Sequence, residues 1–471
     1  MLVPWLSLFD LRTTFTNFMK TEKISYKRKS NDFVILIPIF NDTKYLTNIN
    51  FLKKYRQKVI LCTTDIETPN FYKSLDKIAK DNGFNVVKCR FQQEAKNPWK
   101  IYQKTLLAHD YVLGKSIKEI NAKYVIFLDA DTTCKTNLSY LAGEMDYHEL
   151  DLASVRVIPS KQKTIMEKLQ RIEYHVAMKS RKIYPWLTSG AAMIGKRENL
   201  IEIMDKHSLF FNGGDIEIGK LANLDGLNVG HIPVTFYTDI PETPKKLIKQ
   251  RLSWFCGAFR HCVVNAHTNV SHPIYSFYFT FIIFLMLPLK IYELFVHWFI
   301  LPFLFLFYFV LTFISNWEIR NKYMLLFPLY SLFQVIVMPI LGIYIYGRTV
   351  YQTKNIGMIK SFYKKGHNPF LFSLKIVLIF ALAFFIFNIH LVEGKLMLSD
   401  IDLFSLVGID FHTNKNIPVI IYNGLKLTIL LTSIFLFLYG FFKTKYHLKI
   451  HFDRNKSKYP KIFQNVLTTI L

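Results

Sequence analysis

The C-terminal part of the sequence is dominated by long apolar stretches, and these constrain the fold more than any other feature. Each stretch is long enough, or nearly long enough, to cross a lipid bilayer. They lie at about 274–290, 296–316, 322–346, 371–392 and 417–442. The composition agrees, because 51% hydrophobic residues and a mean hydropathy of +0.19 exceed what a soluble core needs. The sequence therefore predicts an integral protein of the plasma or inner membrane.

The distribution of positive charge predicts how this part is oriented. The loop 347–370 and the tail 443–471 are rich in Lys and Arg, whereas the loop 393–416 carries acidic residues and little positive charge. By the positive-inside rule, the basic loop and the tail are cytoplasmic. A cytoplasmic N-terminal part then requires an even number of crossings before residue 347. Three apolar stretches lie there, so we expect the shortest of them, 274–290, to be interfacial or re-entrant. Residues 263–442 would thus contain about four crossings and one interfacial helix, followed by a basic cytoplasmic tail.

The net charge of +25 restricts the classes of partner. Cytoplasmic anchoring beside anionic membrane lipid explains it most simply, and a basic groove for an anionic ligand such as a nucleotide diphosphate is the alternative. No nucleic-acid motif accompanies the charge, so nucleic acid is not an expected partner. The five cysteines are dispersed without a CxxC pair, which indicates free thiols in a reducing compartment and argues against a zinc site.

The region before the apolar stretches, residues 33–262, has the pattern of an α/β domain. Short apolar, β-branched runs alternate with polar helical stretches such as 68–82 and 98–119, which predicts a mostly parallel sheet covered on both faces. The runs are "FVILIPIF" (33–40), "KVILCTTD" (58–65), "NVVKCRF" (85–91) and "YVIFLDAD" (124–131). In such sheets ligands bind beyond the carboxyl ends of the strands. Residues 1–32 are expected to form an amphipathic segment and a basic linker.

The segment "FLDADTT" (127–133) is the first with a chemical signature. Side chains alternate along a strand, so Asp129 and Asp131 point the same way at the end of the run. Together they offer hard oxygen ligands for Mg²⁺ or Mn²⁺, which usually share their coordination with substrate phosphates. An Asp-rich turn without a metal is the alternative. The apolar strand before this segment favours the metal site.

In these motifs, residues 33–262 resemble the inverting family-2 glycosyltransferases with the GT-A fold. The resemblance is strongest to the membrane-integrated synthases of hyaluronan, chitin, cellulose and related capsules. It implies a Rossmann-like GT-A domain in the cytosol, followed by an α-helical transmembrane bundle. "ILCTTD" matches the second family strand, where Asp65 would hold the uracil or ribose. "NPWKIYQKTLLA" stands where the family has a Lys near the diphosphate, which suggests Lys100, with Lys96 or Lys104 as alternatives.

The resemblance also implies a catalytic region further along the chain. "TSGAAMIGKRENL" (188–200) is similar to the segment in which a Ser-Gly pair, here Ser189 and Gly190, lies close to the donor sugar. "FNGGDIEIG" (211–219) aligns Asp215 with the catalytic base, while Gly214 replaces the usual acidic neighbour. A carboxylate suits deprotonation of an acceptor hydroxyl, although Asp215 is equally suited to cap the following helix. Glu217 is a lesser candidate, since it lies two residues further on and faces elsewhere.

The segment "KQRLSW" (249–254) is similar to the family's QxxRW motif, in which the Trp lies under the acceptor sugar. Gln250 and Trp254 match as acceptor-binding residues, but Ser253 replaces the Arg that contacts the diphosphate. Arg251 would take over this contact, although it points away from the usual position on a helix; Arg260 or a Lys are the alternatives. Without an active-site role, the segment would be a basic interfacial helix with a Trp at headgroup level.

The resemblance implies transfer of a sugar from a UDP-sugar donor, with Mg²⁺ or Mn²⁺, to a growing polysaccharide that is exported through the enzyme's own helices. Transfer of a single sugar to a lipid acceptor, of the ceramide or polyprenyl-phosphate type, is the alternative. A transporter or scaffold that only binds nucleotide is a third possibility, from another class of protein. It predicts that Asp215→Asn leaves function intact.

Overall fold

The computed structural model describes residues 28–91, 109–210, 212–269, 298–353 and 355–360, with short pieces between 283 and 295 and three short strands between 389 and 402. Several sequence predictions lie outside the described residues. They concern most of the N-terminal segment, the lysines at 96, 100 and 104, nearly all of the stretch 371–392, and everything beyond residue 402. The chain divides into two compact units, of which the first comprises residues 1–260 and 286–362.

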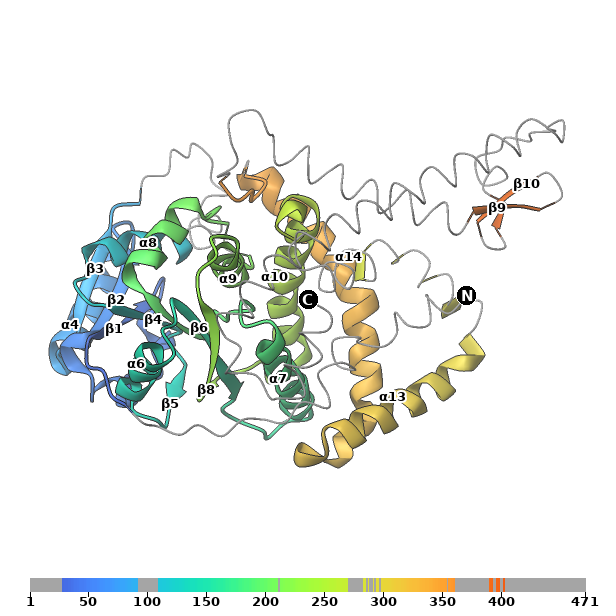
Figure 1. Ribbon diagram of the computed structural model, residues 1–471, viewed down its shortest axis with the longest axis horizontal. Coiled ribbons are helices and arrows are strands. Elements are labelled where there is room, and N and C mark those ends of the chain that lie inside the picture. The colour runs from blue at the N-terminus through green and yellow to red at the C-terminus, as the bar shows by residue number, and fades with distance from the viewer. Residues whose placement is uncertain are drawn as a thin grey trace. The chain divides into compact units, whose positions relative to one another are not determined.

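The first unit is built around a sheet whose described strands follow the order β3-β2-β1-β4-β7-β6-β8-β5 (Figure 1). β1 lies parallel to β2 and β4, and β2 parallel to β3. The bounds are β1 Phe33–Pro38, β2 Val59–Thr64, β3 Asn85–Cys89, β4 Tyr124–Leu128, β5 Thr133–Cys134, β6 Leu152–Pro159, β7 Ala192–Lys196 and β8 Val229–Thr238. The apolar runs identified in the sequence thus form the four strands of the parallel half.

The other half of the sheet departs from the mostly parallel arrangement that the sequence predicts. β7 runs antiparallel to both β4 and β6, and β5 runs antiparallel to β8, so the sheet is mixed. The discrepancy has a simple reason: an apolar run reports that a strand is buried, whereas its direction depends on the connection that leads into it. β4 remains central, and its carboxyl end lies beside the start of β7.

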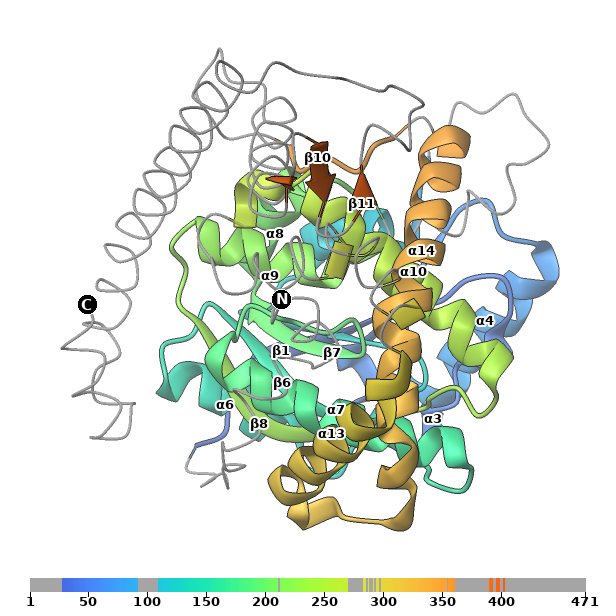
Figure 2. The same cartoon turned by 90° about the vertical axis from the view of Figure 1, so that its right-hand side faces the viewer.

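Helices cover the sheet and extend away from it (Figures 1 and 2). The α-helices are α3 Ile49–Leu52, α4 Pro69–Asn82, α6 Leu138–Tyr147, α7 Ile165–Ile183, α8 Arg197–Lys206, α9 Gly214–Leu224, α10 Pro244–Val263, α13 Leu301–Ser315 and α14 Phe327–Thr353. The 3-10 helices are η1 Thr43–Tyr45, η2 Arg56–Lys58, η3 Ile117–Glu119, η4 Ala266–Asn269, η6 Trp298–Ile300, η7 Trp317–Ile319 and η8 Lys322–Leu326. In the second unit, β9 Ile389–Val392, β10 Lys395–Leu398 and β11 Ile401–Asp402 form a small antiparallel sheet.

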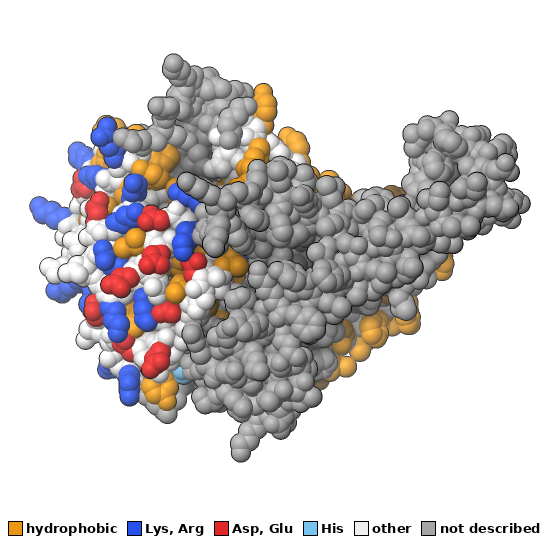
Figure 3. Space-filling model, turned by 45° about the horizontal axis from the view of Figure 1, so that its top comes forward, with side chains coloured by type: hydrophobic (Ala, Val, Ile, Leu, Met, Phe, Trp, Pro, Cys, Tyr) orange, Lys and Arg blue, Asp and Glu red, His pale blue; other side chains and the backbone are white. Residues whose placement is uncertain are grey.

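Two apolar helices follow the α/β domain in the first unit. Among the described residues, one helix, Lys322–Thr353, is long and apolar enough to cross a membrane, and Leu301–Ile314 is a shorter apolar helix. Many side chains of this region are exposed, for example Phe303 at 68% and Ile314 at 61%. In Figure 3, basic and acidic side chains are intermingled on the surface of the α/β domain, and hydrophobic side chains, in orange, lie along the edge of the molecule away from that domain. The stretches 296–316 and 322–346 are therefore largely helical, while the predicted bundle as a whole lies mostly outside the described residues.

Two hydrophobic clusters position the functional region. The larger one lies between the sheet and the helices α4 and α6. The second joins α7 and α10 to the apolar helices through Leu169, Ile172, Leu247, Tyr308, Met324, Phe327 and Tyr330. Close helix contacts extend this packing, because Gly342 of α14 lies directly against Phe255 of α10. The apolar helix α14 is thus built onto the α/β domain.

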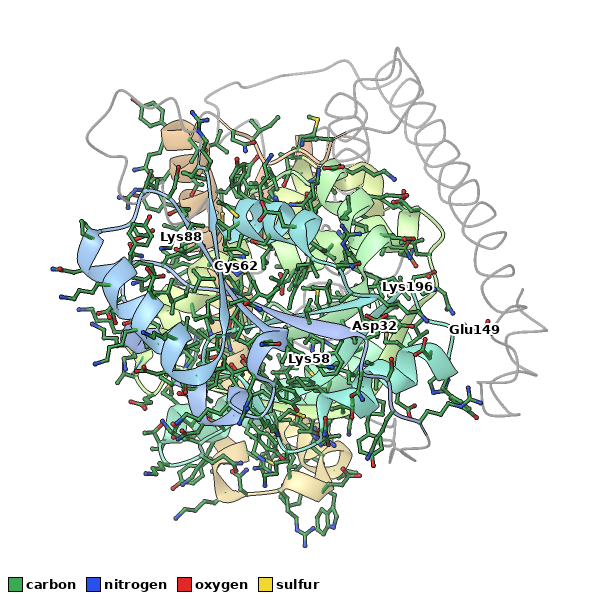
Figure 4. The ribbon with its side chains drawn as sticks, turned by 90° about the vertical axis from the view of Figure 1, so that its left-hand side faces the viewer. Asp32, Lys58, Cys62, Lys88, Glu149 and Lys196 are labelled. Carbon is green, nitrogen blue, oxygen red and sulfur yellow. The ribbon has the colours of Figure 1, made fainter. Side chains whose placement is uncertain are left out.

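All five cysteines are free, as the sequence predicts, and all five are buried. Cys62, labelled in Figure 4, lies on β2 and has no exposed surface. Burial raises the pKa of its thiol to about 12. The thiol of Cys62 is therefore a protonated part of the core and not a reactive group.

Candidate active site

The acidic pair Asp129 and Asp131 follows β4, whose five residues are all buried. The backbone N–H of Asp129 donates to the carbonyl of Ala191, 3.1 Å away, which ties this turn to the residue before β7. The carboxylate of Asp131 accepts hydrogen bonds from the hydroxyls of Thr132 and Thr238, at 3.1 and 3.2 Å. Both acidic residues thus lie at the carboxyl end of a central strand, as the sequence predicts.

Asp215 lies in the first turn of α9, and its side chain faces the segment that leads into β7. Its Oδ2 accepts a hydrogen bond of 2.8 Å from the backbone N–H of Gly190. The hydroxyl of Thr188 donates to the backbone carbonyl of Asp215. Gly213, in the left-handed conformation at φ 77°, is the residue that caps α9. Asp215 is therefore not the cap, and the structure brings it together with the predicted Ser189–Gly190 pair.

A small cavity joins these segments. It is lined by Pro38, His109, Asp110, Leu113, Phe127, Leu128, Asp129, Gly190, Met193, Asp215 and Ile218. Three of the residues predicted from sequence, Asp129, Gly190 and Asp215, thus lie around one space. The cavity also contains His109 and Asp110, which sequence reasoning missed. A single His-Asp dipeptide has no spacing that distinguishes it from an ordinary pair of polar residues.

The cavity is strongly acidic in character. Burial, together with the charges of Asp131 and Asp215, raises the pKa of Asp129 to about 7. Burial also raises the pKa of Asp215, against the opposing hydrogen bond from Gly190. Burial alone would lower the pKa of His109, but the hydrogen bond to Asp110 and the charges of Asp129 and Asp215 raise it. Such a site favours the binding of positive charge.

The residues present fit a divalent cation only if the substrate completes its coordination. Among the described residues, no group of three His, Cys, Asp or Glu side chains is arranged to hold a metal ion. Mg²⁺ needs one or two carboxylates when substrate phosphates provide the remaining ligands. Asp129 and Asp131 offer such carboxylates, and burial is the main reason why the pKa of Asp129 is raised.

On α10, the contacts of Arg251 differ from those that the sequence predicts. Its side chain is buried, and its guanidinium lies 2.6 Å from the carboxylate of Glu173. The hydroxyl of Tyr330 lies 3.4 Å from the same group. Arg260, the predicted alternative, is paired with Glu217 at 2.6 Å and has no exposed surface. Both guanidinium groups are thus paired with carboxylates, of which Glu173 is 21% exposed and Glu217 is fully buried, and the predicted contact of Arg251 with a diphosphate would require the pair with Glu173 to break.

The remaining motif residues of α10 lie next to this ion pair. The indole of Trp254 is 43% exposed, and one face lies 3.8 Å from the Arg251 guanidinium. Gln250 accepts a hydrogen bond of 2.7 Å from Arg251. The hydroxyl of Ser253 donates to the side chain of Asn212 at 2.6 Å, three residues before Asp215. Figures 1 and 2 show α10 beside α14. Gln250 and Trp254 are thus held in position but do not line the cavity.

The other predicted residues are more peripheral. Asp65 is exposed at the end of β2, and its carboxylate accepts a hydrogen bond of 2.9 Å from the backbone of Phe91. Lys100 lies outside the described residues. Glu217 is fully buried and bonded to Ser208 and Arg260, so it does face away from the cavity, as expected.

Comparison with known proteins identifies the family. The chain is 25% identical over 221 residues to the poly-beta-1,6-N-acetyl-D-glucosamine synthase of Staphylococcus aureus (strain COL). This match covers 45% of the chain and 50% of the relative, so the chain spans about half the length of the curated relative. The same similarity is found in other strains of that species.

Among solved structures, the chain is similar to the mannosyltransferase PcManGT from Pyrobaculum calidifontis in complex with GDP-Man and Mn²⁺. The TM-score is 0.47 at 13% identity, over 74% of this chain and 95% of that one. Mannosyl-3-phosphoglycerate synthase from Rubrobacter xylanophilus has a TM-score of 0.29 at 12% identity, over 49% of this chain and 73% of that one. The model of glycosyl transferase family group 2 matches residues 124–392, more than half of the sequence. The chain therefore belongs to this family of glycosyltransferases.

Proposed function

We propose that the chain is a membrane-bound inverting glycosyltransferase that adds sugars from a UDP-sugar to a growing polysaccharide and exports the product through its own helices. The observation that carries this proposal is the hydrogen bond between Gly190 and Asp215 in the cavity that also contains Asp129. It holds a carboxylate in one orientation where a sugar acceptor and a nucleotide-sugar donor would meet.

In the proposed reaction, Asp215 accepts the proton of the acceptor hydroxyl as its oxygen attacks the anomeric carbon. The bond between that carbon and the diphosphate breaks, and its electron pair leaves with the nucleoside diphosphate. Attack opposite the leaving group inverts the anomeric carbon. A Mg²⁺ or Mn²⁺ ion held by Asp129 and Asp131, when bound, supplies positive charge to the leaving group. Asp65, Ser189 and Gly190 are proposed to bind the donor.

The acceptor is proposed to stack on Trp254, with Gln250 at its edge. The exposed indole offers an apolar ring face for a sugar, and Arg251 fixes its orientation from the other side. Trp254 lies on α10, and α10 packs against α14, which is part of the candidate membrane span. A polymer held at this position would be close to the apolar helices. Membrane lipid is the proposed partner of their exposed side chains.

The test is a transfer assay on membranes that contain the full-length chain. Labelled UDP-glucose, UDP-N-acetylglucosamine and UDP-glucuronate are each incubated with Mn²⁺, and the products are separated by size. A ladder of high molecular weight from one donor supports the proposal. A single product that is extracted into organic solvent would overturn polymer synthesis in favour of transfer to a lipid acceptor. Incorporation that is unchanged in Asp215→Asn would show that the assignment of Asp215 as the catalytic base is wrong.

A further inference from the structure

The pair His109 and Asp110 is built into the cavity by close packing. Nδ1 of His109 lies 2.9 Å from Oδ1 of Asp110, and the Asp110 side chain is only 4% exposed. Oδ2 of Asp110 has no hydrogen-bond partner among the described residues. A Cβ atom added to Gly214 would lie 2.8 Å from Cγ of Asp110, so this carboxylate is packed against the start of α9. The pair, at the start of the segment 109–116, is therefore packed against the helix that carries Asp215.

The negative charge of Asp110 favours the protonated, positively charged form of His109. A buried carboxylate is costly unless a cation accompanies it, and His109 is the residue bonded to it. When Nδ1 donates to this carboxylate and the ring is positively charged, Nε2 also carries a proton. Of the described residues that line the cavity, His109 is the one whose side chain can be positively charged.

The two arginines proposed from sequence do not provide this charge. Arg251 is bonded to Glu173, and Arg260 to Glu217. A nucleotide sugar brings two phosphates into a cavity that already contains three carboxylates, from Asp110, Asp129 and Asp215. Hydrogen-bond donors that face the departing diphosphate stabilise its developing charge, in addition to a bound metal ion. The cavity offers the imidazole of His109 for this purpose.

We propose that His109 is a donor-binding residue, whose Nε2–H donates a hydrogen bond to the diphosphate of the nucleotide sugar, and that Asp110 is the residue that positions it. This inference rests on the proposed function. During transfer, negative charge grows on the diphosphate oxygen as its bond to the anomeric carbon breaks, so the hydrogen bond strengthens. His109 keeps its proton, and the proton of the acceptor hydroxyl goes to Asp215.

The experiment compares the binding of UDP and UMP, each with Mn²⁺, to the full-length protein purified in detergent, by calorimetry. GDP and GMP are titrated in parallel, because the proposed contact involves phosphate and not the base. In His109→Gln the affinity for the diphosphate should fall at least about tenfold, since a charged hydrogen bond is lost. The affinity for the monophosphate should change much less. Asp110→Asn should reduce the same discrimination, because the ring loses its anchor.

His148→Gln is the matched control. His148 forms a similar His–carboxylate pair, at 3.2 Å from Glu144, but it does not line the cavity. Its replacement should leave the binding of UDP and UMP unchanged. His109→Lys, which keeps a positive charge, should retain most of the preference for UDP. The apparent melting temperature of each variant is measured, and if His109→Gln does not fold, the Lys variant decides: loss of its preference for UDP would overturn the inference.

The outcomes separate this inference from the proposed function. If the wild-type protein transfers sugar and binds UDP, but His109→Gln binds UDP equally well, the role of His109 is wrong and the proposed function stands. If the folded wild-type protein binds neither nucleoside diphosphate and transfers no sugar, both are wrong. Preference for the diphosphate that disappears in His109→Gln and persists in His148→Gln supports the inference.

Discussion

Glu173 on α7 accepts hydrogen bonds from two other helices: from Arg251 on α10, at 2.6 Å, and from Tyr330 on α14, at 2.5 Å. The guanidinium of Arg251 also lies over the ring of Trp254. One carboxylate thus connects the candidate membrane span to the proposed acceptor platform. Because α7, α10 and α14 also share a hydrophobic cluster, this polar contact orients helices that apolar packing already holds together.

Glu173→Ala should destabilise the protein substantially. It leaves the buried guanidinium of Arg251 without its carboxylate, and removal of one partner from such a pair costs roughly 3 kcal/mol. Thermal unfolding of the detergent-solubilised protein, followed by intrinsic fluorescence, measures the effect. Lys118→Ala is the control, because it breaks an exposed pair with Asp205 that contributes about 1 kcal/mol at most. Equal melting temperatures for the two variants would contradict the structural role of Glu173.

Asp215→Asn should abolish most of the transfer while the variant still binds UDP. An amide cannot accept the acceptor proton, and loss of a general base typically reduces turnover about a hundredfold to ten-thousandfold. The steady-state rate with saturating donor measures this. Asp225→Asn changes an acid at the other end of α9, which is paired with Lys206, and should keep near wild-type turnover. A rate in Asp215→Asn within a factor of about three of wild type would exclude Asp215 as the base.

Gly219→Ala should lower both stability and turnover. A Cβ at this position would lie 2.8 Å from the backbone carbon of Trp186, so α9 would have to move away from the segment that leads to Gly190. Overpacking of this kind costs about 1–3 kcal/mol. Gly347→Ala is the control in α14, since a Cβ there meets nothing within 4 Å among the described residues. It should be neutral or stabilise the helix by up to about 1 kcal/mol. Full activity in Gly219→Ala would show that α9 need not lie this close.

Stability should decrease in acid because of His175. Burial, reinforced by the charges of Lys179 and two arginines, lowers the pKa of His175 from the ordinary value of 6.5 to about 3. Since the folded-state pKa is the lower one, the unfolded chain binds the proton first. The contribution is fully present above pH 6.5 and is lost as the pH falls towards 3, by up to about 1.4 kcal/mol per pH unit.

Melting temperatures of the wild type and His175→Gln between pH 7.5 and 4 measure this loss. The variant has no imidazole to protonate and should decline less steeply as the pH falls. Two parallel curves would contradict the assignment, whatever their absolute difference.

Much of the site could be predicted because its signals are local in sequence. Asp129 and Asp131 follow an apolar run that becomes the central strand β4, and the carboxyl end of such a strand is where ligands bind. The glycine-rich turn before Asp215 likewise marks the start of α9. The role of Arg251 could not be predicted in this way, because its partner Glu173 lies 78 positions earlier in the chain. His109 was missed for a similar reason: only the fold places it beside Asp129 and Asp215.

The sequence by itself determined where the chain is apolar, where its strands end and which acidic residues stand at those ends. These features follow from side-chain chemistry and from the period of secondary structure, both of which act over a few residues. Only the tertiary structure decided the direction of β7 and which cations are neutralised. The physical reason is that a buried charge takes its partner from whatever the fold brings within a few ångströms. Arg251 and Arg260 are thereby committed to carboxylates, and among the described residues that line the cavity His109 is the one whose side chain can carry a positive charge.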